Sequence, residues 1–345
     1  MSSSCLQLTV QNLAHYLEQL GLSQAGDKLV VQELRGGVSN VVLLAEWMDK
    51  SNRRFVVKQS LGKLRVADDW FSERERIFRE ADSIAALEPV LGEGSLPRVV
   101  HVDLSNYAYV MTAASRGSIS WKESLLQGQC DPGVARLVGS LLARMITGSR
   151  KVPQFQVGFA DRTVFGQLRI HPYYQQAAAR NPDVEKEICE LIASTSEIQT
   201  ALVHGDYSPK NILVDGTGIF LIDFEVVHWG DPAFDCAFLL NHLFLKSFHQ
   251  PSFSKRYLEL IWEFWRALCR ELSRGEIREL EPMTVRHLGA LMLARIDGKS
   301  PVEYLTDGEV KKRVRHAAKQ ILNQRPTTLS DAVEIVEPHF GELRG

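Results

Sequence analysis

The chain has 345 residues, of which 45% are hydrophobic and 24% charged, a composition typical of a globular protein with two domains or lobes. Its formal net charge is −2, so no global positive field attracts nucleic acid or an anionic membrane, and we expect neither partner. No apolar run reaches the roughly 18 residues that a membrane-spanning helix needs.

The five cysteines are odd in number and scattered, and no Cys-x-x-Cys pair occurs. This pattern favours reduced thiols over a disulfide framework. The N-terminus lacks the charged segment and apolar run that are typical of a signal peptide. We therefore expect a cytoplasmic protein, either a monomer or a homodimer.

The N-terminal part predicts a small sheet with two helices. Apolar residues at helical spacing predict a helix at about 10–20, and a charged helix is expected from about 71 to 87. For the second helix, Ser72 and Glu75 fit a capping box and Glu88-Pro89 fits its end. Five strands are expected: 29–34, 41–47, 54–59, 98–103 and 107–112.

Small residues at 113–117 predict a linker between an N-lobe, 1–113, and a C-lobe, 114–345. In the C-lobe, Asp131-Pro132 begins a helix that runs to about Thr147, and 153–182 is expected to be rich in loops. Short strands are expected at 201–203, 212–214 and 219–222. Further helices are expected at about 232–247, 251–273, 283–295 and 302–323.

The segment His204-Gly205-Asp206 followed by Asn211 carries the strongest functional signal. Asp206 and Asn211 keep the five-residue offset of a kinase catalytic loop, and Asp223 ends the next apolar strand. Asp206 would accept or orient a hydroxyl proton, while Asn211 and Asp223 offer the hard oxygen ligands that Mg²⁺ prefers. Each acid alone could be a turn or cap residue, but Asp206, Asn211 and Asp223 together at this spacing predict ATP-dependent phosphoryl transfer.

Two features upstream fit the same chemistry. Gly36-Gly37, between two expected strands, could let the backbone approach phosphate oxygens, although Gly-Gly also makes ordinary hairpin turns. Lys58 ends the third strand, where a kinase places the lysine that binds the α- and β-phosphates; a solvent-facing lysine is the alternative. Glu80 is its expected partner, because neighbouring apolar residues put it on a half-buried helix face.

Several neighbours have less certain roles. His204 is expected to be a buried, neutral, structural residue. Asp231 and Asp235 are expected to cap a helix and to brace the catalytic loop. Glu225 could touch a second metal or lie behind the first, and Lys210 could neutralise the transferred phosphate or be an exposed loop residue.

On these residues, the chain resembles the aminoglycoside phosphotransferase/choline kinase family over about 30–300. Its His204-Gly205-Asp206 and Ile222-Asp223-Phe224-Glu225 motifs are characteristic of the small-molecule branch of the protein-kinase fold. The resemblance implies an α+β fold with two lobes, an antiparallel sheet plus helix in the N-lobe and a mainly helical C-lobe. Val57-Lys58-Gln59 also resembles methylthioribose kinases, although those carry Asp-Pro-Glu where this chain has Asp223-Phe224-Glu225.

The resemblance implies ATP and Mg²⁺ as cofactors and a small-molecule hydroxyl as the acceptor, such as a sugar or amino alcohol. An aminoglycoside acceptor, or a nucleotide-binding protein without catalysis, are the alternatives. Contacts to a polar or anionic acceptor are expected near Phe165–Tyr174 and 295–299, with Arg169, His171 and Arg295 as candidates; surface salt bridges and packing at the edge of the core are the alternative roles for these residues. The implied nucleotide-binding residues are Gly36, Gly37, Ser39, Asn40, Lys58, Glu80 and, beside adenine, Met111, Thr112 and Ala114.

Overall fold

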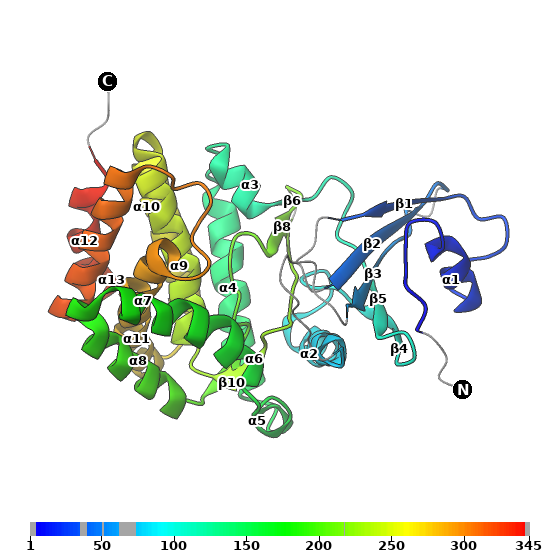
Figure 1. Ribbon diagram of the computed structural model, residues 1–345, viewed down its shortest axis with the longest axis horizontal. Coiled ribbons are helices and arrows are strands. Elements are labelled where there is room, and N and C mark those ends of the chain that lie inside the picture. Colours follow the sequence, from blue (N-terminus) through cyan, green and yellow to red (C-terminus); the bar gives the residue numbers. More distant parts are fainter. Residues whose placement is uncertain (1–4, 35–39, 50–51, 62–73, 217, 342–345) are drawn as a thin grey trace. The chain divides into compact units, whose positions relative to one another are not determined.

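The computed structural model describes residues 5–34, 40–49, 52–61, 74–216 and 218–341. The internal contacts of the chain divide it into two compact units, Met1–Arg116 and Gly117–Gly345 (Figure 1). The first unit is built on a sheet and the second is mainly helical.

The first unit contains a five-stranded antiparallel sheet in the order β1-β2-β3-β5-β4. Its strands are β1 (Leu29–Glu33), β2 (Asn40–Trp47), β3 (Arg54–Ser60), β4 (Val99–Asp103) and β5 (Ala108–Thr112). Two helices accompany the sheet, α1 (Leu13–Gln19) and α2 (Arg76–Leu91). All five strands expected from the sequence are therefore present.

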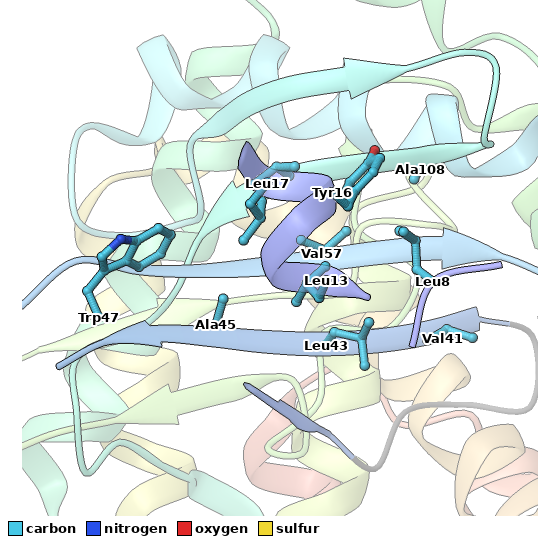
Figure 2. Packing of buried hydrophobic residues seen from close by; sticks show 11 residues of the cluster. Leu8, Leu13, Tyr16, Leu17, Val41, Leu43, Ala45, Trp47, Val57 and Ala108 are labelled. Carbon is cyan, nitrogen blue, oxygen red and sulfur yellow. The ribbon is translucent and has the colours of Figure 1, made fainter. Parts of the chain in front are cut away.

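The core of this unit lies between α1 and one face of the sheet. Figure 2 shows α1 lying across the strands, with its Leu13 and Leu17 near Leu43 and Val57 of the sheet, and all four side chains are buried. Because alternate residues of a strand point to opposite faces, the residue that follows Val57 faces away from this core. That residue is Lys58, and α2 contacts the strand that carries it.

The ends of α2 differ from the prediction. Ser72 lies outside the described residues, and Glu75 makes no side-chain capping bond at the helix start. The helix does not stop at Glu88-Pro89 but continues to Leu91. Pro89 lies in the last turn, where it removes a single backbone hydrogen bond, and the burial of Leu91 offsets that loss.

The second unit contains two small sheets. One has the order β6-β8-β9, and the other pairs β7 with β10. The strands are β6 (Ile119–Ser120), β7 (Ala201–Val203), β8 (Ile212–Val214), β9 (Ile219–Leu221) and β10 (His228–Gly230). The sequence predicted β7, β8 and β9, whereas β6 and β10 are too short to leave an apolar pattern.

Helices form the rest of this unit, and α9 is buried along nearly its whole length between α10 and α11. Within the described residues, none of the helices combines the length and apolar character that a bilayer crossing requires. The helices are α3 (Trp121–Leu126), α4 (Pro132–Ser149), α5 (Gln154–Gly158), α6 (Thr163–Phe165), η1 (Gly166–Gln175), α7 (Gln176–Arg180), η2 (Pro182–Val184), α8 (Glu185–Glu197), α9 (Ala233–His249), η3 (Pro251–Phe253), α10 (Ser254–Arg270), α11 (Arg274–Asp297), α12 (Gly308–Gln324), α13 (Leu329–Val336) and η4 (Glu337–His339).

The stretch 153–182, expected to be loops, is instead largely helical. α6, η1 and α7 are continuous, and η1 is a π-helix with Pro172 inside it. Aromatic residues of the stretch pack on α9. The ring centroids of Phe165, in α6, and Tyr174, in η1, lie 4.9 and 6.3 Å from that of Phe234. This packing overrides the local breaker signals that favoured loops.

Candidate active site

In the first unit, Lys58 and Glu80 form a buried ion pair. Lys58 Nζ lies 2.6 Å from Glu80 Oε1, and the two residues are 8% and 1% exposed. β3 presents the lysine on the face opposite the α1 core, and α2 brings the glutamate to it. The pairing expected from the sequence is therefore present, and its role toward a nucleotide stays a prediction.

The other predicted nucleotide contacts are less fully defined. Gly36, Gly37 and Ser39 lie outside the described residues, and Asn40 is a buried residue at the start of β2. Met111 is buried within β5.

The backbone after Met111 is partly engaged inside the unit. The Thr112 N–H donates to Arg98 O at 3.0 Å, and Ala114 O accepts a hydrogen bond from Arg54 Nη1. Contact between this stretch and adenine stays a prediction.

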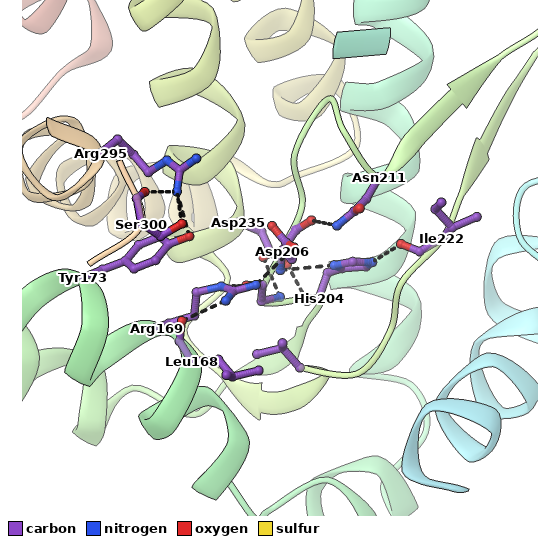
Figure 3. Close-up of polar contacts among 12 residues, drawn as sticks. Leu168, Arg169, Tyr173, His204, Asp206, Asn211, Ile222, Asp235, Arg295 and Ser300 are labelled. Atoms are coloured by element: carbon purple, nitrogen blue, oxygen red, sulfur yellow. Dashed lines mark hydrogen bonds and ion pairs between the residues drawn. The ribbon is translucent and has the colours of Figure 1, made fainter. Parts of the chain in front are cut away.

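In the second unit, a short loop leaves β7 at His204 and reaches β8 after Asn211. Asp235 of α9 braces its start, accepting from the His204 N–H at 2.6 Å and from the Gly205 N–H at 2.9 Å (Figure 3). Burial raises the pKa of Asp235 to about 7, against the lowering effect of these two hydrogen bonds. Asp231 accepts from the Ala233 N–H at 3.0 Å at the start of α9, so both expected roles are confirmed.

His204 holds the loop to the next strand. Its Nε2 contacts Ile222 O at 3.2 Å, and its Nδ1 accepts from the Asp206 N–H at 3.2 Å. Burial lowers the pKa of His204 to about 4, so the ring is neutral at physiological pH. This confirms the structural role predicted for it.

Gly205 is required by both its conformation and its surroundings. Its φ is +75°, and a Cβ there would lie 2.6 Å from Val226 Cγ1. Any side chain would therefore displace the backbone that presents Asp206.

Arg169 of η1 lies against Asp206, a contact that no sequence pattern predicted. Its Nη2 lies 3.1 Å from Asp206 Oδ2, and its Nε donates to Gly205 O at 2.6 Å (Figure 3). Arg169 is buried, whereas the Asp206 side chain keeps 19% of its surface exposed. The arginine therefore holds Asp206 Oδ2 on the buried side of the carboxylate. The sequence indicated Arg169 as a candidate acceptor contact and not as a partner of Asp206, because the stretch that carries it was expected to be rich in loops.

Asn211 and Asp223 flank the same loop. Asn211 Nδ2 donates to Asp206 O at 3.0 Å, which leaves its amide oxygen as the atom that could bind a cation. The Ile222 N–H donates to Asn211 O at 2.9 Å and so joins the segment that ends in Asp223. Asp223 has φ 71°, a left-handed conformation that costs on the order of 1 kcal/mol and is often found at functional sites.

These donors fit Mg²⁺. Among the described residues, no group of three or more His, Cys, Asp or Glu side chains could hold a metal by itself. Mg²⁺ commonly takes one or two protein oxygens, with water and phosphate oxygens completing its shell. One carboxylate and one amide oxygen are therefore a suitable protein contribution.

A pocket opens beside Asp206 within the second unit. It is lined by aromatic residues and by an excess of cations. Of the predicted acceptor contacts, Arg295 lines it, whereas buried Arg169 and exposed His171 are not among its described lining residues; contact with an acceptor stays a prediction. Lys210 also lines it, and Glu225 contributes negative charge near Arg169. The charged lining residues are Asp206, Glu303, Lys122, Lys210, Lys246 and Arg295.

The chain matches the model of a known protein family. A family model described as "Phosphotransferase enzyme family" matches residues 30–268 of this chain. The resemblance that the sequence motifs indicated is thereby confirmed.

Two curated proteins are similar to the chain. Methylthioribose kinase 1 of Oryza sativa subsp. japonica is 25% identical over 252 residues, which cover 65% of this chain and 58% of that protein. Methylthioribose kinase of Escherichia coli O45:K1 (strain S88 / ExPEC) is 24% identical over 284 residues, covering 71% and 66%. The chain thus spans less than two thirds of the length of either relative.

Solved structures share the fold at low sequence identity. A choline kinase from Cryptosporidium parvum Iowa II superposes with a TM-score of 0.55 and 10% identity, covering 96% of this chain and 100% of that one. An amicoumacin kinase, solved with AMP-PNP and Ca²⁺, gives a TM-score of 0.53 and 14% identity, covering 93% and 96%. These likenesses confirm the protein-kinase-like α+β fold.

Proposed function

We propose that this chain, which belongs to the phosphotransferase enzyme family, transfers the γ-phosphoryl group of ATP to a hydroxyl group of a small molecule. The observation that carries the proposal is the loop from His204 to Asn211. It presents a partly exposed carboxylate, Asp206, next to the amide of Asn211. A binding protein without catalysis has no need of this arrangement.

Asp206 is the catalytic residue in this proposal. Its carboxylate would orient the acceptor hydroxyl for in-line attack and take up the proton that the hydroxyl releases. Asp235 and Arg169 hold the loop and the carboxylate in place, because their hydrogen bonds fix the backbone on both sides of Gly205. Such positioning supplies much of the catalysis in phosphoryl transfer, where little covalent chemistry falls to the protein.

Asn211 and Asp223 would hold Mg²⁺, which neutralises charge on the phosphates when bound. Lys58, fixed by Glu80, would bind the α- and β-phosphates, with Gly36, Gly37, Ser39 and Asn40 as backbone or polar contacts. We assign nucleotide binding to the N-lobe, 1–113, and catalysis and acceptor binding to the C-lobe, 114–345.

An aminoglycoside acceptor is disfavoured by the charges around Asp206. Aminoglycosides are polycations, and a site for them would be rich in carboxylates. The described residues that line the pocket include two acids, Asp206 and Glu303, and each is paired with a basic side chain. The remaining cations would repel such an acceptor.

The proposal is tested by measuring phosphoryl transfer from ATP to a panel of alcohols, sugars and amino alcohols. Transfer is expected with Mg²⁺ and is expected to stop when EDTA removes the metal. Tight ATP binding without turnover on any acceptor would instead favour a nucleotide-binding protein.

A further inference from the structure

Lys246 is a fully buried cation in the pocket beside Asp206. It lies on α9 with 0% of its surface exposed, and among the described residues its Nζ donates only a long hydrogen bond, 3.4 Å, to His242 O. Its Nζ also lies 5.2 Å from the centre of the Tyr304 ring. Among the described residues, no carboxylate lies within ion-pair distance of it. A buried ammonium without an anion is costly, so its presence calls for a functional explanation.

Two further donors in the same pocket lack acceptors. Arg295 Nε and Tyr304 Oη are both buried, and neither has a hydrogen-bond partner among the described residues. The guanidinium is nevertheless fixed, because Arg295 Nη1 donates to Tyr173 Oη and Ser300 Oγ, each at 3.0 Å (Figure 3). Buried donors without an acceptor in the protein are commonly completed by water or a ligand, and both of these atoms belong to residues that line the pocket beside Asp206.

The charges of the pocket do not balance. Lys122 pairs with Glu303, and Asp206 pairs with Arg169. Lys210, Lys246 and Arg295 remain without a carboxylate among the described lining residues. Burial lowers the pKa of Lys246 to about 7; Lys122 and Arg295 act in the same direction and Glu303 opposes them, so a bound anion would favour the charged form of the amine.

We propose that this pocket binds an oxyanion of the acceptor, a carboxylate or a phosphate, through Lys246, Arg295 and Tyr304. The acceptor class is then an alcohol that carries a negative charge, with its hydroxyl at Asp206. The inference rests on the proposed function, because it assigns the acceptor of the same site. It explains why cations face a catalytic carboxylate that is already neutralised by Arg169.

The binding test needs no turnover. Thermal unfolding of the full chain is measured in phosphate, in acetate and in tetramethylammonium chloride at constant ionic strength. The proteins are wild type, Lys246→Met, Tyr304→Phe and the control Lys186→Met, whose side chain is 80% exposed. Phosphate or acetate is expected to raise the Tm of wild type and of the control, and whichever acts at lower concentration identifies the anion.

In Lys246→Met the apparent affinity for that anion is expected to fall about tenfold or more, and in Tyr304→Phe by less. Without anion, Lys246→Met is expected to melt at or above wild type, because an uncompensated charge is gone; a purely structural lysine would give a lower Tm. Equal responses of wild type and Lys246→Met, or a larger effect of tetramethylammonium, would overturn the proposal.

A turnover test separates this inference from the proposed function. Acceptors that share one carbon skeleton are compared as the neutral alcohol, the amine, the carboxylate and the phosphate. Turnover confined to neutral or amine members contradicts the inference. If anion binding depends on Lys246 but no acceptor is phosphorylated, the anion site is supported and only the proposed kinase activity is contradicted.

Discussion

Arg169 donates to both Gly205 O and the carboxylate of Asp206, and thereby ties π-helix η1 to the catalytic loop. Arg169 also packs on Tyr173, which lines the pocket beside Asp206. The Arg169 and Arg295 guanidinium carbons each lie 5.5 Å from the centre of the Tyr173 ring. Arg169, which positions the proposed base, and Arg295, which belongs to the proposed anion site, therefore both pack on the Tyr173 ring.

Replacing Arg169 with Met is expected to reduce both activity and stability. The change leaves a partly buried carboxylate without its partner, and loss of one member of a buried ion pair typically costs about 3–5 kcal/mol. We expect kcat to fall at least about tenfold. Urea unfolding and steady-state kinetics measure the two effects.

Arg169→Lys is the matched comparison, because it keeps the charge but loses the two-pronged contact. It should recover part of the stability and less of the kcat. Wild-type kcat in Arg169→Met would show that the arginine does not position Asp206.

Replacing Glu80 with Gln is expected to weaken the use of ATP. Lys58 would lose its ion pair with the Glu80 carboxylate and be held less firmly, so the KM for ATP should rise several-fold and kcat should fall. The control is Asp82→Asn, an exposed acid on the same helix, which should behave as wild type. Equal kinetics for the two variants would mean that the ion pair has no role in binding the nucleotide.

The buried His204 predicts a loss of stability in acid. Its folded-state pKa of about 4 lies below the ordinary histidine pKa of 6.5, so the unfolded chain binds the additional proton between these values. The stability that comes from a neutral imidazole is therefore present above pH 6.5 and is lost as the pH falls toward 4.

Urea unfolding between pH 7.5 and 5 checks this expectation. His204→Gln should show a shallower decline than wild type, and the comparison separates the histidine from Asp235, whose raised pKa of about 7 acts in the opposite direction in this range. His15→Gln, at a side chain that is 72% exposed, should leave the slope unchanged. An identical slope in wild type and His204→Gln would contradict the neutral assignment.

Sequence patterns predicted the strands and contacts that are specified by short, continuous segments of the chain. The strands that frame the catalytic loop, the pairing of Lys58 with Glu80 and the brace formed by Asp235 all follow from apolar periodicity and motif spacing. In each case a short segment carries both the chemistry and the secondary structure that positions it.

What the sequence could not predict depends on contacts between distant segments. The helical path through η1 is set by packing on α9, and it alone brings Arg169 to Asp206. Lys246 gave no signal either, because a lysine in an apolar helix is normally exposed and only the fold reveals its burial.

The central claim is that Asp206 acts on the acceptor hydroxyl, and Asp206→Asn tests it most directly. The substitution keeps the size of the side chain and removes its basicity. With Mg²⁺ and the best acceptor from the panel, phosphoryl transfer should fall at least about 100-fold while ATP binding stays close to that of wild type. Phosphoryl transfer by Asp206→Asn at the wild-type rate would contradict the account.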